Sequence, residues 1–177
     1  MTNYRRDKHP GATWFFTVNI AQRYQCLLID NIDILRSAFR SIHASHPFIV
    51  NAIVILPDHL HTIWTLPEDD ANYPLRWRLI KTYFSKSIKT SELVSLSRKK
   101  KGERGIWQRR YWEHRIRSEK DFNRHIDYIH YNPVKHGYVN QVSQWPWSSF
   151  HRFVRDGLLD SDWGAGVDCH GQFGERV

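Results

Sequence analysis

Two strand-like segments joined by a very short turn lie near the middle of the chain, and they restrict its fold more than any other feature. Residues 48–56 form a mostly apolar run, and residues 59–66 follow directly after Pro57 and Asp58. Both are typical turn residues, because proline presets φ and the aspartate side chain bonds nearby backbone N–H groups. Strands joined by so short a turn pair antiparallel, so the sequence predicts a β-hairpin here.

The segments on either side of the hairpin extend the pattern. Aromatic and β-branched residues predict a strand over 13–20, and apolar residues at helical spacing predict a helix over 31–45. A second helix is expected over 74–93 and a further strand over 106–117. A third helix is expected over 118–132, ending or bending before a proline, because the residue before proline resists the α conformation.

This order of elements predicts the fold class. Strand, helix, strand, strand, helix and strand in succession match the split βαβ pattern of a ferredoxin-like sheet. We therefore expect an α+β fold, in which an antiparallel sheet carries helices on one face and gains an added C-terminal helix and a tail.

The length of 177 residues corresponds to one domain. We expect residues 1–140 to form that domain and the Trp-rich residues 141–177 to form a tail packed on it, with large aromatic side chains buried rather than stacked on bases. No apolar run approaches the ~18 residues of a membrane span, and the charged start of the chain does not resemble a signal peptide. A cytoplasmic protein with no membrane partner is expected.

Positive charge suggests a polyanionic partner. Lysine and arginine number 26 against 18 aspartate and glutamate residues, for a net charge of +8, although solubility alone is an alternative reason for such an excess. The loop 97–105 is either an arm that contacts phosphates or a solvated loop. The candidate DNA-binding residues are Arg5, Arg6, Arg78, Lys81, Lys86, Lys89, Arg98, Lys99, Lys100 and Lys101.

A histidine pair, His59-Leu60-His61, lies at the start of the second hairpin strand. Alternate side chains of a strand point to one face, so both imidazoles face the same way and Leu60 faces the other. Two imidazoles on one face make half of a divalent-metal site. A chance pair among 11 histidines is the alternative interpretation.

The third helix carries a second candidate group. Tyr128 and Asn132 are four residues apart and therefore share a helix face, and Asp121 and His125 fall on the same polar stripe. Facing the histidine pair, this helix would join a phenol nucleophile to a metal site. The alternative is a half-buried tyrosine followed by an asparagine that caps the helix.

Several motifs in order resemble one known family. Residues 11–19, 56–64, 107–114 and 128–137, together with the Trp-Pro-Trp tail, resemble the REP-associated tyrosine transposases, a branch of the single-tyrosine HUH transposases. HUH denotes two histidines separated by a bulky apolar residue, which here are His59 and His61. The resemblance spans nearly the whole chain.

The resemblance implies an activity and a set of roles. The family cuts and rejoins single-stranded DNA beside hairpins of the REP or BIME type, through a 5′-phosphotyrosine. Tyr128 matches the nucleophile, His59 and His61 match ligands of Mg²⁺ or Mn²⁺, and residues 1–140 match the catalytic domain. Insertion-sequence relatives have glutamine at the place of Asn132, so this shorter amide is a third ligand, a helix cap or a group that positions Tyr128.

The resemblance further implies a bacterial, nucleoid-associated protein, either a monomer or a homodimer. An unperturbed tyrosine has a pKa of about 10, so Tyr128 needs help to react at neutral pH. A metal ion held by the two imidazoles would polarise the attacked phosphate.

Two other functions fit the same topology. A non-catalytic protein that binds hairpin DNA or RNA would use the sheet without chemistry, which leaves His59, His61 and Tyr128 without a role. A metal-dependent hydrolytic nuclease would attack with water and form no covalent adduct.

Overall fold

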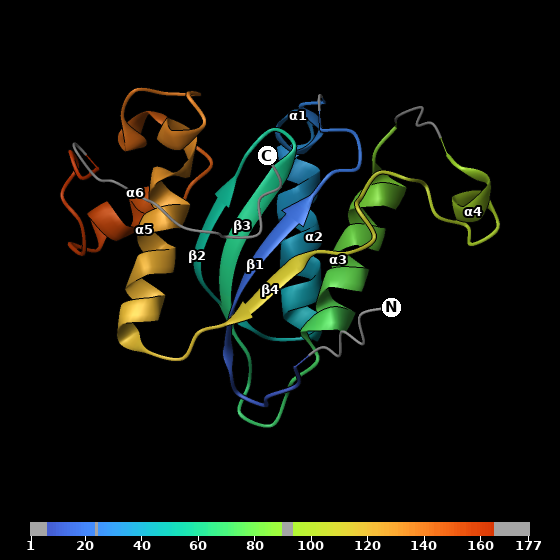
Figure 1. Ribbon diagram of the computed structural model, residues 1–177, viewed down its shortest axis with the longest axis horizontal. Coiled ribbons are helices and arrows are strands. Elements are labelled where there is room, and N and C mark those ends of the chain that lie inside the picture. Colours follow the sequence, from blue (N-terminus) through green and yellow to red (C-terminus); the bar gives the residue numbers. More distant parts are fainter. Residues whose placement is uncertain (1–6, 24, 90–93, 165–177) are drawn as a thin grey trace, which may run out of the picture.

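The computed structural model describes residues 7–23, 25–89 and 94–164. Its centre is an antiparallel sheet of four strands in the order β2-β3-β1-β4, shown in Figure 1. The strands are β1 (Thr13–Asn19), β2 (Ile49–Ile55), β3 (His59–Thr65) and β4 (Trp112–Arg115). The first and third strands are the central pair, so the predicted ferredoxin-like α+β fold is confirmed.

Helices cover both faces of this sheet. The α-helices are α1 (Leu27–Asp30), α2 (Ile32–Ser45), α3 (Tyr73–Ser87), α4 (Leu96–Lys99), α5 (Glu119–Lys135) and α6 (Phe150–Arg155), and a 3₁₀ turn, η1, spans Val142–Gln144. In Figure 1, α2 and α3 lie side by side on one face of the sheet, and α5 lies on the other. No helix within the described ranges is long and apolar enough to cross a membrane.

The larger core lies between the sheet and the pair α2 and α3. Trp64 from β3 and Trp77 from α3 stack with ring centroids 4.2 Å apart, and Phe48 packs against Trp64 at 4.3 Å. Leu35 and Ile42, two of the apolar residues of α2, are buried in the same cluster. Burial of several large aromatic side chains provides most of the stabilisation expected of such a core.

A smaller core lies under α5. Ile126 and Ile129 of the helix pack with Phe15 of β1 and Ile63 of β3. Strand alternation therefore sends Leu60 into the larger core, whereas the side chains of His59, His61 and Ile63 share the face that α5 covers. This arrangement positions the candidate site between β3 and α5.

The predicted end of the third helix is wrong. Helix α5 continues through Pro133 to Lys135, and its last turn is closed by the His136 N–H, which donates to the Asn132 carbonyl at 3.0 Å. Asn132 and Pro133 are both buried. Tertiary burial of this segment overrides the local preference against helix before proline, and Gly137, at φ 71°, supplies the left-handed residue that ends the helix.

Three other boundaries differ from the predictions. Helix α3 ends at Ser87, because the buried Ile88 adopts an extended conformation. The last strand is only Trp112–Arg115, and upstream of it the chain meets the end of β1 only through an isolated bridge between Trp107 and Ile20 and a hydrogen bond from the Gln108 N–H to the Asn19 carbonyl at 2.9 Å. The predicted loop 97–105 also contains part of a helical turn, α4.

Residues of the tail form hydrogen bonds with β2, which lies at the edge of the sheet. The Trp145 indole donates to the carbonyl oxygen of Ile55 at 3.0 Å, and the Ser149 N–H donates to that of Ile53 at 2.8 Å. Trp145 and Phe150 are buried. The division at residue 140 stays a prediction, since residues 165–177 lie outside the described part of the chain.

Candidate active site

The two histidines of β3 are buried and lie next to each other, with ring centroids 5.0 Å apart. The Nδ1 of His59 bonds the Asp58 carboxylate at 2.6 Å. The Nδ1 of His61 lies 2.9 Å from the Thr17 hydroxyl, which the pairing of β1 with β3 places directly opposite. Because both Nδ1 atoms are engaged, a metal ion would bind this pair through Nε2, and the bonds to Asp58 and Thr17 would fix the ring orientations.

Asp58 is itself held in place. Arg23 Nε donates to its other carboxylate oxygen at 2.7 Å. Burial raises the pKa of Asp58, but the hydrogen bonds and positive charges of His59 and Arg23 outweigh burial and lower this pKa to about 2. The carboxylate is therefore ionised at neutral pH and holds the imidazole of His59 in one orientation.

One face of α5 meets the histidine pair. The Tyr128 ring lies 5.1 Å from the His61 ring, and the His136 ring lies 5.3 Å from the His59 ring. Asn132 is four residues from each and is buried, so the helix period puts it between these two contacts. The structure thus brings together Tyr128, Asn132, His59 and His61.

Tyr128 is buried. The residue is only 1% exposed because its ring packs against Phe15 and His61. Lys135 Nζ donates to the Tyr128 hydroxyl at 3.1 Å and lies 4.7 Å from the ring centroid. Sequence reasoning missed Lys135 and His136, although their spacings of seven and eight residues from Tyr128 put all three on one helix face.

Two known proteins are similar to this chain over nearly their whole length. The chain is 46% identical over 177 residues to the REP-associated tyrosine transposase of Escherichia coli, covering 100% of this chain and 99% of the relative. A Haemophilus influenzae protein provisionally given the same name is 47% identical over 169 residues, covering 95% and 96% of the two chains. The chain belongs to the REP-associated tyrosine transposases.

A solved structure supports the same assignment. This transposase chain matches a REP-associated tyrosine transposase bound to a REP hairpin with a TM-score of 0.85 and 46% identity, over 100% of this chain and 99% of the other. No family model matches the chain.

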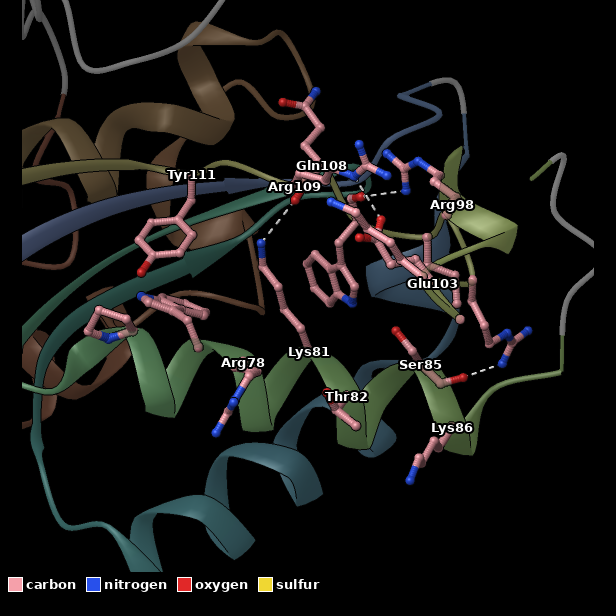
Figure 2. A pocket seen from close by; sticks show the side chains of 18 of the residues that line it. Arg78, Lys81, Thr82, Ser85, Lys86, Arg98, Glu103, Gln108, Arg109 and Tyr111 are labelled. Carbon is pink, nitrogen blue, oxygen red and sulfur yellow. Dashed lines mark hydrogen bonds and ion pairs between the residues drawn. The ribbon is translucent and has the colours of Figure 1, made fainter. Parts of the chain in front are cut away.

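A basic pocket of about 940 Å³ lies between α3 and the segment 98–111 of this transposase, as Figure 2 shows. Lys81 reaches across it, donating to the Gln108 carbonyl at 3.1 Å and lying 5.6 Å and 5.1 Å from the ring centroids of Trp107 and Tyr111. Arg98 donates to the Trp107 carbonyl at 3.1 Å. The pocket therefore combines cations with aromatic rings.

The candidate DNA-binding residues divide into three groups in this transposase. Arg78, Lys81, Lys86, Arg98 and Lys101 line the pocket. Lys89, Lys99 and Lys100 are exposed outside its lining. Arg5 and Arg6 lie outside the described residues.

Proposed function

We propose that this chain cleaves and rejoins single-stranded DNA beside REP-type hairpins through a covalent bond to Tyr128. The observation that carries the proposal is the contact of the Tyr128 ring with His61, one of two imidazoles whose Nδ1 atoms are anchored. Membership of the family and the hairpin bound to its solved relative support the substrate class.

The donor set at this site fits a divalent ion. His59 and His61 would supply two imidazole nitrogens, and Asn132 an amide oxygen, which suits Mg²⁺ or Mn²⁺ better than a third nitrogen would. When bound, such an ion would polarise a phosphate oxygen and neutralise charge in the transition state. Asp58 and Thr17 would keep the two imidazoles aimed at it.

In the cleavage step, the Tyr128 oxygen attacks the phosphorus of one phosphodiester. The Tyr128 O–P bond forms, the bond from phosphorus to the 3′-oxygen breaks, and the proton of the phenol ends on that 3′-oxygen. Rejoining is the reverse step with a 3′-hydroxyl as the nucleophile, so the phosphotyrosine keeps the bond energy and no nucleotide cofactor is needed.

Lys135 would increase the reactivity of the Tyr128 hydroxyl. An ammonium group 3.1 Å from the phenol oxygen stabilises negative charge on that oxygen, both when the phenol loses its proton and when the phenolate leaves during rejoining. The sheet and α5 hold the ring in a buried, fixed orientation, which favours in-line attack.

The basic pocket and the exposed lysines beside it would hold the DNA. Phosphate contacts from Arg78, Lys86 and Lys101 would provide affinity without sequence selection. With DNA as its partner, the protein would act on the bacterial nucleoid.

A denaturing gel tests the proposal. The protein is incubated with a labelled single-stranded REP-type hairpin and Mg²⁺ or Mn²⁺, denatured and separated by size. We expect a band of DNA joined to protein that disappears after protease treatment. Cleavage without a joined band would indicate a hydrolytic nuclease, and binding without cleavage would indicate a non-catalytic hairpin-binding protein.

A further inference from the structure

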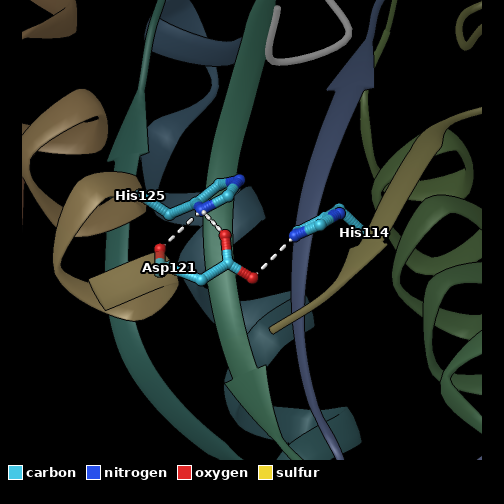
Figure 3. Close-up of side chains that lie close together, drawn as sticks. All are labelled: His114, Asp121 and His125. Carbon is cyan, nitrogen blue, oxygen red and sulfur yellow. Dashed lines mark hydrogen bonds and ion pairs between the residues drawn. The ribbon is translucent and has the colours of Figure 1, made fainter. Parts of the chain in front are cut away.

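Three side chains with metal-binding groups meet where the last strand of the sheet passes the start of α5. His114 comes from β4, and Asp121 and His125 come from the first two turns of α5, as Figure 3 shows. One ligand atom from each of the three lies within 4.8 Å of the other two. Neither His114 nor Asp121 has a part in the chemistry proposed for Tyr128.

The distances within this cluster suit a small ion. His114 Nε2 lies 2.9 Å from one Asp121 oxygen, and His125 Nδ1 lies 3.2 Å from the other. Metal–ligand bonds of 2.0–2.2 Å around tetrahedral zinc put neighbouring ligand atoms about 3.4 Å apart. His125 Nδ1 also lies 2.8 Å from the backbone carbonyl oxygen of Asp121, so an ion would replace this hydrogen bond as well as the two to the carboxylate.

We propose that His114, Asp121 and His125 form a second metal site, which binds a divalent ion of the zinc class and clamps β4 to the helix that carries Tyr128. Two imidazoles and a carboxylate are ligands typical of Zn²⁺ and Co²⁺, whereas Mg²⁺ prefers oxygen. Three protein ligands leave a fourth position for water.

The three side chains of the cluster differ in their exposure to solvent. The His125 side chain is 7% exposed, that of Asp121 is 22% exposed and that of His114 is 36% exposed. The buried histidine fixes one side of the site, and the exposed one leaves a path for the ion from solvent. The His114 and His125 rings stack at 4.8 Å, so their planes are already ordered.

The cluster is a neighbour of the histidine pair on β3 and is separate from it. Phe15 lies between them, with its ring centroid 4.6 Å from that of His125 and 5.6 Å from that of His61. An ion on the cluster would tie the edge strand to α5 only three residues before Tyr128. The site does not depend on the chemistry proposed for Tyr128, because its ligands are defined by β4 and the start of α5 alone.

Calorimetric titration of the full chain with ZnCl₂, and absorption spectra with CoCl₂, test the second site. A His59→Ala/His61→Ala double variant removes the first pair. We expect this variant still to bind one Zn²⁺ per chain, to melt at a higher temperature with Zn²⁺ and to give the visible absorption of four-coordinate Co²⁺. Adding His114→Ala or Asp121→Asn should weaken Zn²⁺ binding at least tenfold and abolish the thermal shift.

A matched control is His43→Ala, which removes an exposed histidine of α2 and should leave Zn²⁺ binding intact. Circular dichroism without metal identifies any variant that fails to fold. If the double variant does not fold, the same comparison is made in the wild-type chain, where His114→Ala should lower the number of bound Zn²⁺ ions by one. A folded chain in which His114→Ala and Asp121→Asn leave Zn²⁺ binding unchanged would overturn the proposal.

Discussion

The ammonium nitrogen of Lys135 lies 3.1 Å from the phenol oxygen of Tyr128, two turns further along α5. The same nitrogen lies 4.7 Å from the ring centroid, so one cation contacts both the edge and the face of the tyrosine. This contact exists only because α5 continues past Pro133. It ties the reactivity proposed for Tyr128 to the last turn of the helix.

Replacing Lys135 with methionine should slow adduct formation about a hundredfold, because it removes a charge that stabilises the phenolate. Binding of hairpin DNA should change much less. Single-turnover measurements of the covalent band across a range of pH check this, and Lys135→Arg should restore part of the rate. An unchanged rate in Lys135→Met would assign Lys135 a purely structural role.

Tyr128→Phe should eliminate the covalent adduct while leaving the fold and hairpin binding intact. The lost hydroxyl and its bond to Lys135 should cost about 1 kcal/mol of stability. Tyr131→Phe is the matched control, since Tyr131 lies three residues away on the same helix, and this variant should still form the adduct. Mass spectrometry of the DNA-linked peptide identifies the residue, and a phosphodiester on Tyr131 would contradict the assignment.

His61→Ala should abolish cleavage with Mg²⁺ or Mn²⁺ and keep most hairpin affinity, because phosphate contacts supply most of that affinity. Asp58→Asn should reduce cleavage less than His61→Ala does. It loses the charge that orients His59, and metal affinity should fall roughly 10- to 100-fold. Raising the Mn²⁺ concentration should therefore rescue Asp58→Asn but not His61→Ala. Full cleavage by His61→Ala would remove the metal role from the pair.

Neutralising Lys99, Lys100 and Lys101 together should flatten the plot of log affinity against log salt by up to about three units, if each contacts a phosphate. The exposure of all three residues next to the basic pocket is the reason for the expectation. Arg36→Gln/Arg40→Gln, which changes exposed cations of α2, is the control and should leave the slope almost unchanged. An equal slope in the triple variant would mean that this segment is only a solvated surface.

The free energy of unfolding should fall at acid pH because His130 is protonated in the unfolded chain and not in the folded one. Burial, with the nearby positive charges of Arg152 and His151, lowers the pKa of His130 from 6.5 to about 3. The unfolded chain therefore binds a proton that the folded chain excludes, so His130 costs nothing above about pH 6.5 and destabilises the fold progressively below it. The loss approaches about 1.4 kcal/mol per pH unit between these two pKa values.

Urea unfolding at several pH values measures this slope. His130→Gln can keep a hydrogen bond to Ser149 without titrating, so its stability should fall less steeply below pH 6.5. The same acid dependence in His130→Gln would show that another group is responsible.

Local sequence patterns predicted much of the fold and the placement of the main residues of the candidate site. The apolar runs around Pro57 and Asp58 predicted the hairpin, and the period of two in β3 correctly put His59 and His61 on one face and Leu60 on the other. The helical period also put Tyr128 and Asn132 on one face of α5. These features depend on residues close in sequence, so their periodicity is visible without the fold.

The surroundings of those residues were decided only by tertiary structure. The pairing register of β1 with β3 brings Thr17 to His61, and Arg23 reaches Asp58 from 35 residues away. Burial of Asn132 and Pro133 keeps α5 helical against the local preference of proline, which delivers Lys135 to Tyr128. Strand register and burial are set by the packing of the whole chain. Their stabilisation is the sum of many small contact energies between segments that lie far apart in sequence, so no single segment contains it.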